Sequence, residues 1–471
     1  MAEETSPPSC SKWPGEELKK QQAMAGPLVL MNLSWFGKTV VTTIFLGRLG
    51  NLPLAGGALG YTFANVTGFS VLTGLCYAMD PICGQAFGAR NYGIMRRTLF
   101  MAVILLLLVS IPISLLWFHV DKIMEFFGIS ADIASLSKIF VLYLLPDLVV
   151  TSFLCPLKAY LSCQAVTLPI LITTVVALAL HVPAGFYLSQ TKGLRGLSTA
   201  VWLTDLALVL MLAAYVYFHD KRKCTFSGDG GYRHEEEEDR RTWSQNWTDC
   251  VRLIRLSVPC CLTTCLEWWC YEILLLLSGR LDNARVPVAV LTIVFNFDYI
   301  LYSFMLSLST VVSVRVSNEL GAARPETARG SARVCLSVSV ILGCIGGSLM
   351  AISGRWWGSL FSHDELVLSG VKKMMLLMAV VEVANFPLVV CGGIMRAAAK
   401  PKQAMYATLG GFYFVALPLG ILLAFKLKFQ LAGLVLGFLV GNAITSCVML
   451  VLVGKINWAR EDQKAKELTR V

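Results

Sequence analysis

The sequence predicts an all-α polytopic membrane protein with about twelve transmembrane helices in two pseudo-symmetric six-helix bundles. Three observations support this prediction. Of the 471 residues, 56% are hydrophobic and 15% are charged, with a mean hydropathy of +0.66. Soluble domains carry about 25% charged residues, so a soluble fold could not bury this much apolar surface. Apolar runs that are long enough to cross about 30 Å of hydrocarbon recur along the chain, and its two halves repeat each other.

The apolar runs fall into two groups of six, separated by a polar, glycine-rich segment. Each run can cross the hydrocarbon core as one helix of about 20 residues. The predicted spans are 26–46, 59–80, 98–118, 138–160, 168–189, 196–218, 257–278, 287–311, 333–353, 373–395, 404–425 and 431–454. The corresponding domains are an N-terminal tail (1–25), an N-terminal six-helix lobe (26–219), a linker (220–255), a C-terminal six-helix lobe (256–454) and a C-terminal tail (455–471).

The two halves of the chain share short motifs at nearly constant spacing. The motif GRLGN after the first span returns as GRLDN after the seventh, at the same offset that separates Pro27 from Pro259 (259 − 27 = 232). LRGL, which begins at Leu194, returns as LAGL at Leu431, at an offset of 237 (431 − 194). Because a repeat of six spans brings the chain back to its starting side, an axis along the membrane normal should relate the two halves. Several secondary transporters are built in this way.

Lysine and arginine in short loops predict which loops and chain ends lie on the cytoplasmic side of the membrane. These residues gather in the loops after the second, sixth, eighth and tenth spans and in both tails, whereas the opposite loops are shorter and poorer in them. We therefore expect both termini in the cytoplasm and the protein in the plasma membrane or in a vacuolar or other endomembrane. The net charge of +10 then reflects membrane orientation and anionic lipid. No motif typical of nucleic-acid binding is present, so we expect no nucleic-acid partner.

Two carboxylates lie in the seventh predicted span, within the stretch CLEWWCYE. An ionised carboxylate at the centre of the bilayer costs roughly 2.5 kcal/mol or more on insertion scales. Glu267 is therefore expected to take up and release a proton near neutral pH, as an antiporter requires; the alternative is a structural carboxyl bonded to a neighbouring helix. Glu272 follows five residues later and points about 140° away from Glu267. Glu272 either lines a cleft between the two bundles or makes a polar contact between helices.

Several other polar residues fall inside predicted spans of the C-terminal lobe. Glu382 lies nearly at mid-span with no cation near it in sequence, which favours a second proton site. Asn296 and Asp298 are two residues apart on one helix, so they cannot both face a cleft squarely. Trp268 and Tyr271 could offer aromatic faces to an organic cation, although such residues more often pack against neighbouring helices.

The N-terminal lobe contains three further polar candidates. Lys38, in the first span, either snorkels to the membrane surface or pairs with a carboxylate across the cleft. Asp147 and Asp205, in the fourth and sixth spans, either relay protons or have a structural role.

Cofactor chemistry has no support in the sequence. The 15 cysteines and five histidines form no metal-ligand pattern, and an isolated thiol in a span behaves as a small apolar residue. No nucleotide-binding motif is present either. We expect no metal and no cofactor, and an ion gradient as the energy source.

The stretches MDPICGQAFGARNYG, CLEWWCYE and VSNELGAARPETAR resemble the signature stretches of plant multidrug and toxic compound extrusion (MATE) transporters. The resemblance covers the chain from about Pro27 to Lys455. It implies that the two lobes form a V-shaped cleft and that the protein expels small organic compounds, often cations. Plant members generally exchange them for protons.

The resemblance also implies where protons bind. In eukaryotic members, the coupling carboxylates lie on the first and fourth helices of the C-terminal lobe, and Glu267 matches the first of them. The second position, counted back from Arg396 in GGIMRAAAK, falls on Asn385, which is not acidic. Glu382 lies one turn earlier on a similar face and could replace the missing acid. Asn296 lies about where some animal relatives carry an acid, so we expect it, rather than Asp298, in the cleft.

Together these features predict a proton-coupled antiporter, not an enzyme, that exports small organic compounds or metabolites from the cytoplasm by alternating access. We expect it to act as a monomer. One alternative is a flippase of related fold for lipids or lipid-linked precursors, which a strongly cationic cleft would favour. Another is a transporter-like signalling regulator that acts through its linker and tails. An intramembrane transferase would need paired metal-binding carboxylates or a His–Asp arrangement near the membrane surface, and the sequence contains neither pattern.

Overall fold

The computed structural model describes residues 13–226, 243–282 and 285–469. These residues are predominantly helical, and no strand occurs among them. The first half contains α1 (Trp13–Arg48), α2 (Asn51–Ala64), η1 (Asn65–Phe69), α3 (Ser70–Cys76), α4 (Met79–Gly88), α5 (Tyr92–Trp117), α6 (Val120–Phe126), α7 (Ala131–Cys163) and α8 (Leu168–Phe226). The second half contains α10 (Trp243–Ser278), α11 (Arg285–Gly321), α12 (Pro325–Ser359), α13 (Glu365–Ala397), α14 (Pro401–Thr408), η2 (Leu409–Ala416), α15 (Leu417–Ile421), η3 (Leu422–Lys426), α16 (Gln430–Gly454) and α17 (Trp458–Thr469).

The described helices confirm the predicted number of spans. Eleven helical stretches are long and apolar enough to cross a membrane. The longest, α8, is broken at Gly193, whose φ of 58° and ψ of −133° are not helical. Because α8 therefore comprises two spans, the described residues contain twelve. Two spans are composite: α2, η1, α3 and α4 form the second, and α14, η2, α15 and η3 form the eleventh. The three η segments are π-helical turns, which loosen the helix locally.

The repeat seen in the sequence recurs in the backbone. Three pairs of residues with positive φ lie at corresponding turns of the two halves. They are Arg90 and Ala323, Ala165 and Ala399, and Gly193 and Gln430, at offsets of 233, 234 and 237 (323 − 90, 399 − 165 and 430 − 193). Positive φ is uncommon outside glycine, so its recurrence at these offsets shows that the halves share turns as well as spans.

Two of the helices that follow these turns begin with residues that are typical of helix N-termini. At the start of α5, the Asn91 side-chain oxygen accepts a hydrogen bond from the backbone N–H of Ile94 at 3.1 Å. At the corresponding start of α12, Pro325 occupies the first turn, where its missing N–H is not needed. The motifs GARN and GAARP thus end one helix with a left-handed residue and begin the next, which explains their presence in both halves.

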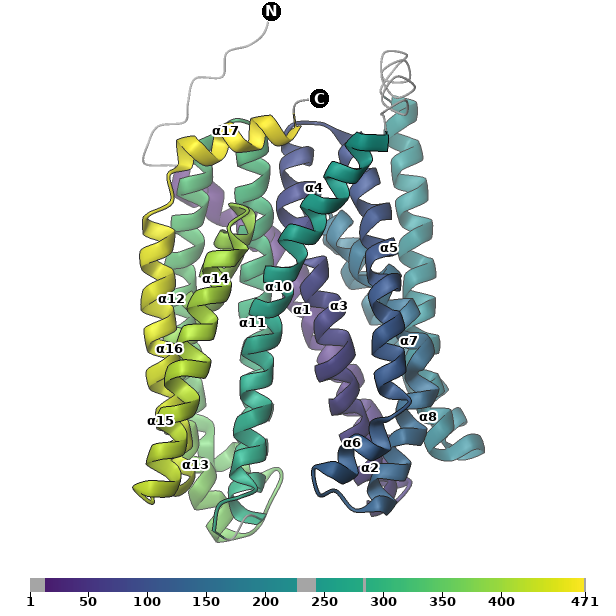
Figure 1. The fold of residues 1–471 in the computed structure, drawn as a ribbon, viewed down its shortest axis with the longest axis vertical. Helices are drawn as coiled ribbons and strands as arrows, with labels where there is room; N and C mark the ends of the chain where they lie inside the picture. The colour runs from purple at the N-terminus through teal and green to yellow at the C-terminus, as the bar shows by residue number, and fades with distance from the viewer. Residues whose placement is uncertain (1–12, 227–242, 283–284, 470–471) are drawn as a thin grey trace, which may run out of the picture.

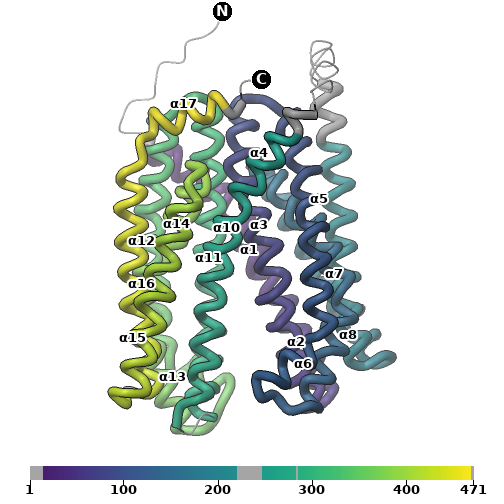
Figure 2. The backbone as a smooth tube through the Cα atoms, in the orientation of Figure 1, coloured from purple at the N-terminus to yellow at the C-terminus, as the bar shows by residue number. Residues whose placement is uncertain are grey.

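The helices form two lobes that make a V (Figure 1). The first lobe holds α2–α8 and most of α1, the second holds α10–α17, and each lobe has its own apolar core. Both described chain ends, the start of α1 and α17, lie at one end of the molecule, which we call the terminal side (the upper end in Figure 1). Figure 2 shows that the lobes approach each other near the terminal side and diverge toward the opposite side.

The first helix connects the two lobes. Residues 13–25, which belong to the predicted N-terminal tail, form the start of α1, and the buried Met24 among them packs against α11 of the C-terminal lobe. The Glu17 carboxylate accepts two hydrogen bonds from the Arg315 guanidinium of α11, at 2.8 and 2.9 Å. The Gln21 amide donates to the carbonyl of Ser331 in α12 at 3.0 Å. The rest of α1 continues into the N-terminal lobe, so α1 ties the lobes together on the terminal side.

Parts of the predicted linker and C-terminal tail are helical as well. Residues 243–255 form the first turns of α10, and 458–469 form α17. An ion pair between Lys400 and Glu461, at 2.9 Å, holds α17 against the turn before α14. The acidic run at 235–238 lies outside the described residues.

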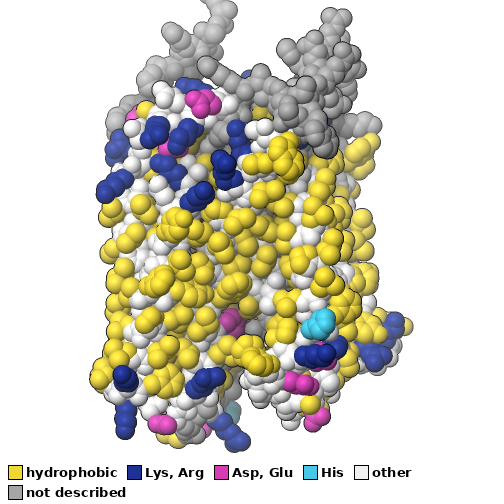
Figure 3. Space-filling model, viewed as in Figure 1, with side chains coloured by type: hydrophobic (Ala, Val, Ile, Leu, Met, Phe, Trp, Pro, Cys, Tyr) yellow, Lys and Arg dark blue, Asp and Glu magenta, His cyan; other side chains and the backbone are white. Residues whose placement is uncertain are grey.

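The surface of the described residues fits a membrane environment. Figure 3 shows a broad apolar band between two ends that carry the charged side chains. Large apolar side chains such as Phe100, Leu108 and Ile352 are exposed to 60% or more. An apolar surface of this extent would be unusual on a soluble monomer and is the lipid-facing surface of a multi-pass membrane protein.

Candidate functional site

Two repeat-related helices, α4 and α11, pack tightly against each other on the terminal side. Gly88 lies against the backbone of Asn318, and Gly321 lies against the backbone of Gln85. A Cβ atom at either glycine would collide with that backbone. The two glycines occupy the same place in the repeat (321 − 88 = 233). The FGARN and LGAAR motifs therefore supply the close contact that shuts the gap between the lobes on this side.

A buried polar cluster crosses the same contact. The Arg396 Nε of α13 lies 3.6 Å from Asp80 Oδ2 of α4. The Ser313 hydroxyl donates to the same Asp80 oxygen at 3.0 Å, and the Arg396 guanidinium donates to the Ser309 hydroxyl at 3.0 Å. The guanidinium also lies 4.5 Å from the centroid of the Tyr77 ring. We call Asp80, Ser309, Ser313 and Arg396 the seal cluster, because it joins the lobes where α4 meets α11.

A cavity of about 250 Å³ lies between the lobes next to the seal cluster. Side chains of α1, α2, η1, α3, α4, α7 and α8 line it from the first lobe, and side chains of α10 and α11 line it from the second. The charged residues of its lining are Asp80, Asp147, Lys158 and Asp205. Trp35, Tyr61, Phe69, Tyr77 and Trp268 form its aromatic walls. The lining of the central cavity therefore combines a few charged and polar side chains with aromatic and aliphatic ones, as is usual for small-molecule sites.

The three polar candidates of the first lobe lie close together. Lys38 Nζ is 2.7 Å from Asp205 Oδ1 of α8, and it donates to the carbonyl of Val201 at 2.9 Å. The partner of Lys38 thus belongs to the same lobe and is not across the cleft. Asp147 lies within electrostatic reach of both groups, and its Oδ1 is buried without a hydrogen bond to any described residue.

Glu267 faces a smaller cavity at the boundary between the lobes. Tyr77, Tyr302 and Arg396 line this cavity of about 40 Å³ together with Glu267. Glu267 Oε1 is buried and receives no hydrogen bond from the described residues. Glu267 and Arg396 are close enough to interact electrostatically. The carboxyl that the sequence singled out therefore lies beside the arginine of the seal cluster.

Two carboxyl groups form a pair within the C-terminal lobe. Glu382 of α13 and Asp298 of α11 are within hydrogen-bonding reach of each other. Neither Glu382 oxygen accepts a hydrogen bond from a donor group in the described part of the chain. Two carboxylates in contact repel strongly when both are ionised, so such a pair favours holding a proton. Nearby, the buried Asn385 amide donates to the Tyr271 hydroxyl at 3.4 Å.

The remaining candidates are placed as follows. Asn296 donates to the carbonyl of Thr292 in its own helix, so Asp298 and not Asn296 lies beside Glu382. Trp268 lines the central cavity and donates to the Tyr302 hydroxyl at 3.0 Å. Glu272 is partly buried on α10 and lines neither cavity.

Sequence reasoning did not select the residues that join the lobes. Asp80 and Arg396 both lie in quoted motifs, but their pairing connects positions 316 residues apart (396 − 80). An acid in the apolar stretch of MDPICGQ was the available signal. Lys158 was also missed, although it is a lysine inside a predicted span.

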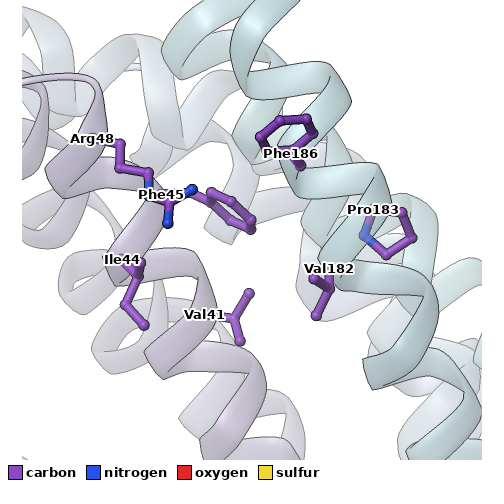
Figure 4. Close-up of a pocket in the computed structure, with 7 residues that line it drawn as sticks. All are labelled: Val41, Ile44, Phe45, Arg48, Val182, Pro183 and Phe186. Atoms are coloured by element: carbon purple, nitrogen blue, oxygen red, sulfur yellow. The ribbon is translucent and has the colours of Figure 1, made fainter.

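A further groove lies on the outer face of the first lobe, between α1 and α8. Figure 4 shows that its lining is apolar apart from Arg48. The groove shares no residue with either cavity between the lobes. No group of three or more side chains suited to a metal ion occurs in the described ranges.

Comparison with known proteins identifies the family. A model of the MatE family matches residues 27–187 and again residues 259–422, so the two matches begin 232 residues apart (259 − 27). This chain belongs to the MatE family. The same offset of 232 separates Pro27 from Pro259 in the sequence repeat. The family match confirms the resemblance to MATE transporters.

Relatives of this MatE chain match it over nearly their full length. It is 54% identical to Protein DETOXIFICATION 56 of Arabidopsis thaliana over 96% of this chain and 90% of that protein. It is 36% identical to Protein DETOXIFICATION 48 of the same plant, over 97% and 85% of the two chains. The crystal structure of the eukaryotic MATE transporter AtDTX14 superposes with a TM-score of 0.88 and 29% identity, over 97% and 100% of the two chains. MATE members are transporters and not enzymes, so this chain is a multi-pass membrane transporter.

Proposed function

We propose that this chain is a proton-coupled antiporter that exports small organic compounds from the cytoplasm by alternating access. Glu267 is the main proton carrier, and Glu382 assists it in the C-terminal lobe. The transporter acts as a monomer, because one chain contributes both lobes and both cavities. It needs no cofactor, since the proton gradient supplies the energy.

The observation that carries this proposal is the position of Glu267 beside the seal cluster. Its carboxyl shares a cavity with Arg396, and Arg396 is the residue that reaches Asp80 in the other lobe. Binding or release of a proton at Glu267 changes the charge that acts on Arg396. In a region of low dielectric such a change is large compared with its value in water. The proton is thereby linked to the contact that holds the lobes together.

The carboxyl pair of Glu382 and Asp298 supports the same mechanism. Glu382 takes the role of the acid that the family pattern places at Asn385, since Glu382 is fully buried and lies against Asp298. A pair that holds one proton can release it when a cation or a water-filled pathway reaches the site. Binding of a substrate that depends on the charge of this pair is then linked to its protonation, which is the linkage that an antiporter requires.

The orientation follows from the basic loops and tails. The positive-inside rule assigns the terminal side to the cytoplasm. The lobes are in contact on that side and diverge on the other, so we assign this conformation to the outward-facing state. The compartment is the plasma membrane or a vacuolar or other endomembrane.

Uptake into liposomes tests the proposal. Purified protein is reconstituted, a pH gradient is imposed, and uptake of organic cations, organic anions and hormones is compared for the unmodified chain and Glu267→Gln. We expect the gradient to drive accumulation of at least one compound and the variant to lose it while remaining folded. Normal transport by Glu267→Gln would show that this carboxyl is structural. If uptake by the unmodified chain is the same with and without the pH gradient, proton coupling is refuted.

A further inference from the structure

Lys158 of α7 is a cation that lines the central cavity without an anionic partner. Its ammonium makes no hydrogen bond or ion pair with any residue that the structure describes, and it lies 4.3 Å from the centroid of the Trp35 ring. Asp205 is within electrostatic reach of Lys158, but it is in direct contact with Lys38. An unpaired charge in a low-dielectric region within the membrane is costly. Lys158 therefore lacks the counter-ion that such a position normally contains.

The carboxylates of the same cavity do not supply this counter-ion. Asp205 is paired with Lys38 at 2.7 Å, and Asp80 is paired with Arg396. Asp147 lies on the same helix as Lys158 but eleven residues earlier (158 − 147), which is roughly 16 Å along a helix. Lys38 and Lys158 thus both lie over the Trp35 ring, and of these two lysines only Lys38 has a carboxylate in direct contact.

Lys158 also lies close to the contact that closes the terminal side. The carbonyl of Cys163, five residues later on α7 (163 − 158), accepts a hydrogen bond from the Asn318 amide of α11 at 3.0 Å. Lys158 is therefore roughly 7 Å along the helix from this contact between the lobes. The backbone of Lys158 therefore lies closer to this contact than the backbone of Asp147 does.

We propose that the central cavity binds small aromatic carboxylates, with the carboxylate on Lys158 and the ring against the aromatic walls of the cavity. The proposal rests on the transport function and specifies its substrate class. A carboxylate would accept a charge-assisted hydrogen bond from Lys158 and replace the missing counter-ion. The volume of about 250 Å³ exceeds that of a small inorganic anion. Tyr61 and Trp268 add aromatic surface that suits a flat ring.

Equilibrium binding tests this inference without requiring transport. Isothermal titration calorimetry on the purified full-length protein in detergent compares naphthoate, naphthamide and naphthylmethylammonium, which share a ring system and differ in charge. We expect naphthoate to bind at least about tenfold more tightly than the other two, as one charge-assisted hydrogen bond predicts.

Three lysine variants locate the charge that recognises the anion. Lys158→Met should weaken naphthoate binding about tenfold and leave naphthamide binding unchanged, whereas Lys158→Arg should retain most of the affinity. Lys192→Met removes an exposed lysine far from the cavity lining and should change nothing. The melting temperature of each variant in detergent reports whether it is folded.

The inference is overturned if folded Lys158→Met binds naphthoate as tightly as the unmodified chain, or if the unmodified chain prefers the naphthyl cation. Displacement of naphthoate by chloride at equal concentration would also overturn it, because the site would then be a general anion site. A failure of proton coupling is distinguishable, since it would abolish gradient-driven uptake and leave the naphthoate affinity and its dependence on Lys158 intact.

Discussion

The ion pair between Lys38 and Asp205 joins α1 to α8 in a buried position, so the cost of breaking it can be predicted. Removing one partner of a buried pair leaves an uncompensated charge and typically costs about 3–5 kcal/mol, whereas replacing both with apolar side chains is often neutral. We therefore expect Lys38→Met to lower the melting temperature of the purified protein in detergent. The double variant Lys38→Met/Asp205→Leu should recover most of the loss. A double variant that is less stable than Lys38→Met would contradict a simple ion pair.

Asp298 and Asn296 provide a matched pair of substitutions two residues apart on α11. Asp298 lies against Glu382, whereas Asn296 bonds to its own helix. If the carboxyl pair holds a transported proton, Asp298→Asn should reduce gradient-driven uptake by about tenfold or more, because one pKa unit of proton affinity corresponds to a factor of ten. Asn296→Ala should change uptake by less than about twofold. Equal losses in both variants, measured in the same liposome assay, would argue against the assignment of Asp298.

The polar positions show how far sequence reasoning reaches at this scale. Residue type and depth in a span were sufficient to select Glu267 and Glu382, because a carboxyl in a membrane span is costly in any fold. The choice between Asn296 and Asp298 depended on helix phase relative to a partner helix. That phase is set by packing of α11 against α13, which the local sequence does not contain.

At the scale of whole helices, the contact of α4 with α11 depends on residues without side chains. A methyl group at Gly88 would meet the backbone of Asn318, which cannot move aside as a flexible side chain can. Overpacking of this kind typically costs about 1–3 kcal/mol. We expect Gly88→Ala to lower the melting temperature in detergent. Gly410→Ala is the matched control because no atom lies within 4 Å of the added carbon, and it should be neutral or slightly stabilising.

The helices themselves were largely predictable, and their ends were not. Long apolar runs predict spans because the bilayer requires every backbone group to be bonded within a helix. The break at Gly193 was anticipated only as a loop between two runs, since the helical pattern continues on both sides of it. The polar residues 13–25 contain no apolar run, yet they form the first turns of α1. Glu17 and Gln21 explain this, because both form hydrogen bonds with the C-terminal lobe.

For the whole molecule, the internal repeat was sufficient to predict two lobes of equal topology, and the backbone confirms it at the turns with positive φ. The contacts between the lobes were not predictable in the same way. The ion pair of Asp80 with Arg396 joins non-equivalent helices of the two repeats, so no symmetry argument indicates it. In the alternating access that we propose, such contacts break and re-form, so they would depend on the state of the molecule as well as on its fold.

Breaking the seal cluster should shift the whole molecule toward a state that is open on the terminal side. Arg396→Gln removes the charge that joins α13 to Asp80, whereas Arg355→Gln removes an arginine of an exposed pair at 3.9 Å, whose side chains are 75% and 80% exposed. Surface pairs of that kind contribute about 0–1 kcal/mol, so the control should leave the equilibrium unchanged. Cys163 is fully buried beside the contact with Asn318 and reports on opening.

The measurement is the labelling of Cys163 by a membrane-impermeant maleimide, quantified by peptide mass spectrometry on protein in liposomes. We expect Arg396→Gln to increase the labelling several-fold, since losing about 1.4 kcal/mol of the closed state changes its population ratio tenfold. Unchanged labelling in a folded Arg396→Gln variant would show that glycine-mediated packing of α4 on α11 holds the lobes without the ion pair. The proton at Glu267 would then need another route to the lobe contact, because its only close cation among the described residues of that cavity is Arg396.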